Sequence, residues 1–192
     1  IILKANELDI KENKDKLNAA TLDRLILDEK RIESISNGLE EISKLEDPVG
    51  KIIENWSRPN GLKIEKISIP LGVIGVIYES RPNVSADAAG LCLKSGNAII
   101  LRGGSESFHS SSKIVEIINR SYENFKLPAG VLQYIPTKDR NAVGHLLRMD
   151  NFVDVIIPRG GRSLIERVIN ESKVHVIRHL DGICHTYIHK SS

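Results

Sequence analysis

The sequence predicts an α/β fold with an open, mostly parallel sheet that helices cover on both faces. After Pro70, short and wholly apolar runs alternate with segments of helical periodicity. Runs without polar residues are typical of parallel strands buried on both faces, and strand–helix alternation is the pattern of a layered α/β domain. The pattern before Pro70 differs, so we expect three parts: an N-terminal helical segment at 1–47, an extended β arm or linker at 48–70 and an α/β domain at 71–192.

The first segment contains one clear amphipathic helix, from Asp28 to Leu45. Its apolar residues recur at steps of three and four with acidic residues between them, and Asp28 is well placed to act as the N-cap. Pro48 and Gly50 follow and end the helix. The apolar face consists of Ile32, Ile35, Leu39 and Ile42.

The β arm contains the stretch RPNGLKIEKISIP, which reads as a turn followed by a strand with alternating polar and apolar residues. The alternation changes phase between Ile64 and Ile67, which predicts a bulge or a bend at this point. One face of the strand is polar, so we expect an exposed arm. The edge of such an arm could pair with another subunit and form a homo-oligomer.

In the α/β domain the two patterns alternate along the chain. The apolar runs predict five strands, which begin at Val73, Ala98, Val131, Val153 and Val174. Helical periodicity predicts four helices, at 85–94, 107–125, 139–147 and 162–170. Because these helices connect parallel strands, we expect right-handed crossovers.

Composition excludes several classes of function. The sequence has 27 Lys and Arg against 25 Asp and Glu, and the net charge of +2 is spread along the chain, which argues against a nucleic-acid or membrane surface. The two cysteines form neither a disulfide framework nor a Cys-x-x-Cys motif, and the six histidines lack the further ligands of a metal site. With no secretion signal or membrane-spanning run in the sequence, we expect a cytoplasmic protein with a small-molecule ligand.

Two strands of the predicted sheet end in similar sequence motifs, IILRGGSES and VIIPRGGRS. Each motif joins an apolar strand to Arg-Gly-Gly and then to the start of a helix that contains serine. In open α/β sheets, ligands bind at the carboxyl ends of strands, where glycines allow positive φ and close approach and where free N–H groups favour anions. The two motifs therefore indicate an anion site, and a pair of ordinary glycine turns is the alternative.

The two helix starts differ in charge. The helix after the second motif begins with Arg162 and has no acidic residue before Glu166, which suits pyrophosphate. The helix after the first motif has Glu106 in its first turn, where a carboxylate repels phosphate but accepts hydrogen bonds from ribose hydroxyls. Arg102 would then lie at the ribose, where NAD-dependent enzymes carry a carboxylate, and would suit the 2′-phosphate of NADP. The usual G-x-G-x-x-G fingerprint is absent, so a dinucleotide would have to be held differently.

Four longer stretches carry a resemblance to a known family. They are PLGVIGVIYESRPNVSADAAGLCLKSGNAIILRGGSES, LPAGVLQYI, VDVIIPRGG and LDGICHTYI. In this order and spacing they are similar to the γ-glutamyl phosphate reductases, also called glutamate-5-semialdehyde dehydrogenases, within the aldehyde dehydrogenase superfamily. The similarity extends from Asp47 to Ser192, and IYESRPNV, LKSGNAIILRGGSE and IPRGG are its most specific parts.

The resemblance implies an oxidoreductase of proline biosynthesis, which uses NADPH to reduce γ-glutamyl phosphate to glutamate 5-semialdehyde and phosphate. In such enzymes a cysteine thiolate displaces the phosphate to form a thioester, which a hydride then reduces. The fold implied is a Rossmann-like dinucleotide-binding domain at 71–192. The cofactor-binding positions implied are Arg102, Ser105 and Glu106 at the ribose, Pro158, Arg159, Gly160 and Gly161 over the pyrophosphate, and Leu180 near the nicotinamide.

Neither cysteine of this chain is expected to be the nucleophile. Cys184 and His185 are adjacent on a predicted strand and would point to opposite faces, which disfavours a dyad and leaves Cys184 as a small buried hydrophobe. Cys92 lies in the middle of a helix and is expected in the core. The resemblance places the reactive cysteine beyond Ser192, so we expect this chain to be an N-terminal part that binds the dinucleotide without catalysing alone.

Two further residues are candidates for the reaction centre. Asn83 is similar to the oxyanion-binding asparagine of the superfamily, although the helix that follows is shorter here than in ordinary aldehyde dehydrogenases. Arg81 follows a buried strand and could meet the carboxylate or acyl phosphate of the substrate, with a solvated turn arginine as the alternative.

Two other functions stay open at this point. One is a non-catalytic nucleotide-binding or oligomerisation module derived from the family. The other is a different acyl-phosphate or thioester reductase of the same superfamily.

Overall fold

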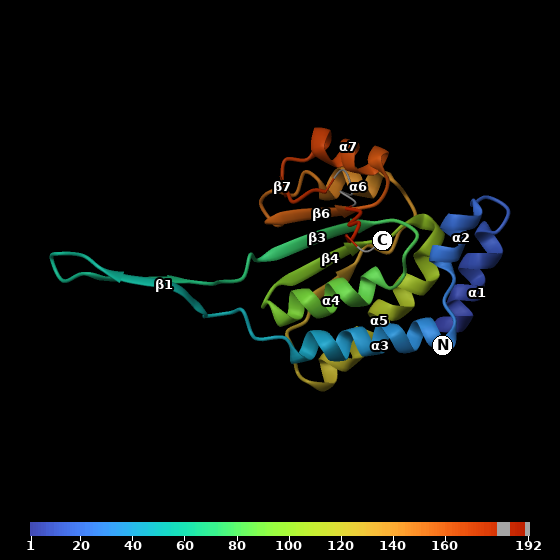
Figure 1. Ribbon diagram of the computed structural model, residues 1–192. Helices are drawn as coiled ribbons and strands as arrows, with labels where there is room; N and C mark the ends of the chain where they lie inside the picture. The colour runs from blue at the N-terminus through green and yellow to red at the C-terminus, as the bar shows by residue number, and fades with distance from the viewer. Residues whose placement is uncertain (180–184, 191–192) are drawn as a thin grey trace.

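The computed structural model describes residues 1–179 and 185–190 and confirms the predicted α/β fold (Figure 1). In this part of the chain a five-stranded sheet has the order β5-β4-β3-β6-β7, and every neighbouring pair of strands is parallel. The chain runs outward from β3 to β5 and then returns to the other side of β3, so the strand order reverses between β3 and β6. The strands are β3 (Val73–Tyr78), β4 (Ala98–Arg102), β5 (Leu132–Tyr134), β6 (Val155–Arg159) and β7 (His175–Val176).

Helices cover both faces of the sheet, as the apolar strands predict. In β3, Val76 packs into the core beneath α4 and α5, while the next residue, Ile77, packs into the core beneath α6 and α7. Successive residues of one strand thus enter opposite cores, which is why the strand contains no polar residue. The helices are α4 (Val84–Lys94) and α5 (Phe108–Asn124) on one face, with a 3₁₀ turn at Ser105–Ser107 before α5, and α6 (Asn141–Leu146) and α7 (Arg162–Glu171) on the other (Figure 1).

Three helices precede the sheet, namely α1 (Ile2–Asn13), α2 (Ala19–Leu25) and α3 (Glu29–Lys44). The predicted cap of α3 is confirmed, because the Asp28 carboxylate accepts a hydrogen bond from the backbone N–H of Arg31 at 2.7 Å. The apolar face of α3 packs on α4, where a Cβ atom at Gly90 would lie 2.7 Å from the Leu39 side chain. Glycine at this position therefore lets the two helices approach closely.

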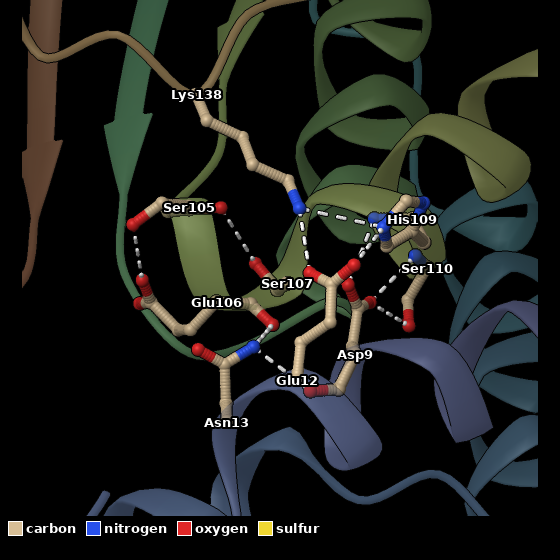
Figure 2. Close-up of polar contacts among 10 residues, drawn as sticks. Asp9, Glu12, Asn13, Ser105, Glu106, Ser107, His109, Ser110 and Lys138 are labelled. Atoms are coloured by element: carbon tan, nitrogen blue, oxygen red, sulfur yellow. Dashed lines mark hydrogen bonds and ion pairs between the residues drawn. The ribbon is translucent and has the colours of Figure 1, made fainter. Parts of the chain in front are cut away.

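A buried carboxylate joins α1 to the start of α5 (Figure 2). Asp9 is fully buried and accepts hydrogen bonds from the backbone N–H groups of His109 at 3.0 Å and Ser110 at 2.7 Å, and from the Ser110 hydroxyl at 2.6 Å. Burial raises the pKa of Asp9, and these hydrogen bonds offset only part of the rise. Because first-turn N–H groups have no partner within a helix, Asp9 supplies the cap that α5 lacks locally.

Asn6 and Asn13 extend this junction from α1 to neighbouring segments. The Asn6 amide donates to the Leu25 carbonyl at 2.8 Å, and its oxygen accepts from the Leu27 N–H at 2.8 Å, which fixes the end of α2. The Asn13 amide donates to the carbonyl of Glu106 at 3.4 Å (Figure 2). Helix α1 therefore supports both α2 and the loop that follows β4.

The arm is an antiparallel hairpin of β1 (Ile52–Ser57) and β2 (Lys63–Ile67) that projects away from the rest of the chain (Figure 1). The irregularity predicted between Ile64 and Ile67 is present, because the register shifts between the pairs Ile52–Ile67 and Glu54–Lys66, but the extra residue is on β1 and not on β2. Both faces of the hairpin are exposed, so no core imposes a strict alternation on its sequence.

We expect Asp9→Ala to lower the free energy of unfolding by about 2 kcal/mol, because the capped N–H groups and the buried Ser110 hydroxyl would lose their acceptor. Urea unfolding at pH 7, followed by circular dichroism, measures the change. Asp15→Ala is the matched control, since Asp15 is exposed and has no partner among the described residues, and its effect should stay below about 0.5 kcal/mol. Equal effects of the two substitutions would contradict the capping role.

Candidate functional site

The carboxyl ends of β3, β4 and β6 open into one cleft of about 820 Å³. This is the edge at which ligands bind in open α/β sheets, and the cleft lies where the strand order reverses. Residues from α2, α6 and α7 complete its walls. The cleft brings together both predicted Arg-Gly-Gly loops, and the predicted positions that line it are Arg81, Arg102, Ser105, Glu106, Arg159, Gly160 and Gly161.

Arg102 is buried at the wall of the cleft and holds a neighbouring segment. Only 5% of its surface is exposed, and its Nη2 atom donates to the carbonyls of Asp139 at 3.1 Å and Lys138 at 3.4 Å. Its Nη1 atom donates to the Gly103 carbonyl, while Nε is buried without a hydrogen-bond partner. Burial lowers the pKa of Arg102, and the Glu106 and Asp139 carboxylates offset part of this decrease, while the Arg140 guanidinium adds to it. The side chain therefore fastens the β5–α6 connection to the end of β4.

The two glycines of the first loop, Gly103 and Gly104, lie close against neighbouring side chains. A Cβ atom at Gly103 would lie 3.0 Å from the Tyr78 hydroxyl and 3.1 Å from the Tyr134 hydroxyl, and one at Gly104 would lie 2.3 Å from the Glu106 carboxylate. Neither residue has a positive φ. The expectation of positive φ was thus wrong for this loop, and the close contacts of its glycines are with side chains of the same chain.

The Glu106 carboxylate links the first loop to the loop after β3. One oxygen, Oε1, accepts hydrogen bonds from the backbone N–H of Ser80 at 2.7 Å and from the Ser80 hydroxyl at 2.8 Å. Ser80 has a φ of 43°, in the left-handed region that non-glycine residues rarely adopt, and Glu106 stabilises this conformation. Among the residues that the structure describes, the other oxygen, Oε2, has only the Ser105 hydroxyl as a partner, at 3.4 Å.

An acidic residue from the end of β3 reaches the second Arg-Gly-Gly loop, and the order of residues along the chain gives no sign of this contact. Glu79, at the end of β3, accepts a hydrogen bond through Oε2 from the backbone N–H of Gly161 at 2.7 Å. The same oxygen would lie 2.4 Å from a Cβ atom at Gly160. Helix α7 itself has no acidic residue before Glu166, as its sequence indicates, but the structure brings Glu79 to its start because β3 and β6 are neighbours and their ends meet.

The cleft has an excess of positive charge. Four arginine side chains that line it form no hydrogen bond or ion pair with any described residue, whereas Arg167 pairs with Glu171 at 3.0 Å. The acidic residues of the lining, Glu79 and Glu106, are already hydrogen-bonded to backbone N–H groups. Such an arrangement attracts an anion. The four arginines are Arg24, Arg81, Arg140 and Arg159.

Three other predicted positions lie away from this cleft or outside the described residues. Asn83 does not line the cleft, and its side-chain amide donates to the Asp87 carboxylate at 2.9 Å. Pro158 is buried within β6, opposite Ile77 of β3. Leu180 lies outside the described residues, as does Cys184.

Sequence reasoning missed several cleft residues for different reasons. Glu79 directly follows β3 and Arg140 follows β5, so the rule that sites lie at the carboxyl ends of strands could have found both. Arg24 and Thr21 come from α2, which reaches the cleft only through packing of the N-terminal helices. No signal in the local sequence indicates that placement.

Within the described ranges, no group of three or more His, Cys, Asp or Glu residues could hold a metal ion. In the same part of the chain, none of the helices has the length and apolar character needed to cross a membrane.

Comparisons with known proteins confirm the resemblance seen in the sequence. The profile of the aldehyde dehydrogenase family matches residues 27–182. Gamma-glutamyl phosphate reductase of Paramagnetospirillum magneticum is 55% identical over 193 residues, which cover 100% of this chain and 46% of that protein. The protein of the same name from Rhodospirillum rubrum is 60% identical over 173 residues, which cover 90% of this chain and 40% of that protein.

A solved structure of a protein with the same name also matches this chain. The crystal structure of gamma-glutamyl phosphate reductase from Thermotoga maritima matches with a TM-score of 0.88 at 39% identity, over 91% of this chain and 42% of that chain. The chain spans about half the length of the curated relatives it matches, at 46% and 40% of the two proteins above.

Cys92 offers a test of thiol reactivity in this fold. The prediction that it lies in the core is confirmed, since it is 6% exposed, and burial raises its pKa to about 11. At pH 8 we expect iodoacetamide to modify Cys92 at least about 100-fold more slowly in the folded than in the urea-unfolded protein, because only the thiolate reacts and an unfolded thiol has a pKa near 8.5.

Peptide mass spectrometry follows Cys92 separately from Cys184. The rate in the folded protein should rise with pH up to about 11, because the thiolate fraction of Cys92 grows as the pH approaches its pKa. Equal rates in folded and unfolded protein at pH 8 would show that Cys92 is not protected.

Proposed function

The chain belongs to the aldehyde dehydrogenase family, and from that premise we propose that it is the cofactor-binding part of an NADPH-dependent γ-glutamyl phosphate reductase. The proposed reaction reduces γ-glutamyl phosphate to glutamate 5-semialdehyde and releases phosphate. NADPH would supply the hydride, and the residues described here would bind and orient the dinucleotide. The observation that carries the proposal is the cleft in which both Arg-Gly-Gly loops meet.

The charge of the cleft supports a ligand with several phosphate groups. Arg81 and Arg159 line it without partners among the described residues, and Arg102 has a buried Nε atom without an acceptor. At the start of α7, the N–H of Leu164 bonds to the Gly161 carbonyl at 3.1 Å, whereas the N–H groups of Arg162 and Ser163 have no backbone partner among the described residues. A pyrophosphate beside Arg159 would accept hydrogen bonds from the guanidinium and from this helix start.

Glu106 and Ser105 suit the hydroxyl groups of a ribose. Glu106 Oε1 is occupied by two hydrogen bonds from Ser80, but Oε2 has only one long contact, with the Ser105 hydroxyl. A carboxylate oxygen accepts more than one hydrogen bond, so Oε2 can accept from a sugar hydroxyl without loss of the contacts that hold Ser80.

Binding of a phosphate at the second loop would require the Glu79 side chain to move. Its carboxylate occupies the N–H of Gly161, the position at which a phosphate oxygen would be bound. Two negative groups at one N–H repel each other, so the exposed Glu79 side chain would have to turn away when the pyrophosphate binds.

The arm supports a second part of the proposal, namely that copies of this chain associate through it. Its hairpin projects from the body and both faces are exposed (Figure 1). Several large apolar side chains lie in the open there, which is typical of a surface that another protein covers. They are Ile52, Ile53, Trp56, Leu62 and Ile67.

The cofactor proposal predicts that Arg159→Gln weakens binding of both NADPH and NADH by about fivefold, because both ligands contain the pyrophosphate that the guanidinium would contact. Isothermal titration calorimetry, in which NADPH or NADH is added to the 192-residue chain, measures both dissociation constants. Arg148→Gln is the control, since Arg148 is an exposed arginine outside this cleft and should bind as the wild type does.

Two outcomes would contradict the proposal. One is failure of the wild-type chain to bind either dinucleotide at about 1 mM, the upper end of typical cofactor and substrate affinities. The other is an equal loss of affinity in Arg148→Gln and Arg159→Gln.

The arm proposal predicts that the wild-type chain forms dimers or larger species in sedimentation equilibrium and that Trp56→Ser raises the dissociation constant by about tenfold, because exposed tryptophans at interfaces contribute strongly to binding. Phe152→Ser is the matched control, since Phe152 is 70% exposed but lies on the body of the protein. A monomeric wild type, or equal effects of the two substitutions, would overturn the arm proposal.

A further inference from the structure

Because hydrogen bonds within the chain engage Arg102, a different arginine at the cleft is the better candidate for binding a phosphate. Both terminal nitrogens of Arg102 donate to backbone carbonyls, those of Gly103, Lys138 and Asp139. The guanidinium is therefore engaged in holding the β5–α6 connection. The residue that follows this connection is Arg140, whose exposed side chain lines the cleft.

Arg140 has no acidic partner in the structure. Its side chain forms no hydrogen bond or ion pair with the described residues, and the neighbouring Asp139 carboxylate instead accepts from the backbone N–H of Asn141 at 2.9 Å. The Glu106 carboxylate, on the loop after β4, is hydrogen-bonded to Ser80. Arg140 directly follows Asp139, whose carbonyl Arg102 holds, and both arginines line the cleft, where their positive charge favours an anion.

A second unpartnered arginine reaches the same cleft from the N-terminal helices. Arg24 lies in the last turn of α2, and its side chain lines the cleft without a partner among the described residues. Asn6 fixes the end of α2 through the Leu25 carbonyl and the Leu27 N–H, so this arginine is held on a supported element. Two guanidinium groups on separate elements suit a phosphate monoester, which carries close to two negative charges at pH 7.

We propose that Arg140 and Arg24 bind the 2′-phosphate of NADPH and thereby select it over NADH, and that Arg102 acts as a positioning residue that places Arg140. This inference rests on the proposed function, because it assumes that the dinucleotide binds in the cleft. The site lies beside the loop of Ser105 and Glu106, where the adenosine ribose is proposed. Arg159, by contrast, lies at the end of β6, on the other side of β3.

The test compares NADPH and NADH dissociation constants of the 192-residue chain by isothermal calorimetry. We expect Arg140→Gln to weaken NADPH binding by about tenfold and to leave NADH binding within about twofold, because only NADPH carries the third phosphate. Arg24→Gln should also weaken NADPH binding relative to NADH binding. Arg140→Lys should keep part of the preference, since it retains the charge without the planar fork. Arg148→Gln is the control and should leave both constants unchanged.

A double-mutant cycle tests the positioning role of Arg102. Arg102→Gln should reduce the preference for NADPH, and the same change made in the Arg140→Gln background should reduce it little further. Full additivity of the two effects on the preference would overturn the positioning role. Thermal unfolding of each variant checks that the fold is retained.

The outcomes separate this inference from the proposed function. If wild type binds both dinucleotides and Arg159→Gln weakens both, but Arg140→Gln weakens both equally or neither, the 2′-phosphate assignment is wrong while the cofactor proposal stands. If wild type binds neither dinucleotide, both proposals are wrong.

Discussion

A nearly buried guanidinium connects the two walls of the cleft. Arg102 ends β4, yet its side chain donates to the carbonyls of Lys138 and Asp139, so the loop after β4 and the β5–α6 connection are held together. A charged group with 5% exposure is costly to bury unless its hydrogen bonds are made, and one nitrogen, Nε, still lacks an acceptor. The positions of the loop after β4 and of Arg140 both depend on this interaction.

The same loop is supported from the opposite direction by α1. Asp9 caps α5, which begins just after the loop, and Asn13 donates to the carbonyl of Glu106 (Figure 2). Binding sites work best when their residues are held by packing and by hydrogen bonds from a surrounding layer. The N-terminal helices therefore contribute to the proposed dinucleotide site in two ways, by fixing the loop and by adding Arg24 to the cleft.

Much of the fold could be predicted from the sequence because its signals are local. Apolar runs identify strands buried on both faces, and three- and four-residue periodicity with Asp28 as cap identifies α3. The contacts that could not be predicted are between distant segments: Asp9 caps a helix 100 residues away, and Glu79 reaches Gly161 because β3 and β6 pair. The bulge lies opposite Lys66 and Ile67, within the predicted interval, but the pattern of β2 could not show that β1 carries the extra residue. Both Arg-Gly-Gly loops were predicted at the cleft, but Arg24 of α2 reaches it only through tertiary packing.

A crystal structure of the chain grown with NADPH tests the central claim most directly. The account predicts electron density for the pyrophosphate beside Arg159 and Gly160 and for the adenosine ribose beside Ser105 and Glu106, with Glu79 turned away from Gly161. Dinucleotide bound elsewhere on the protein, with the cleft between the two loops filled by solvent, would contradict it.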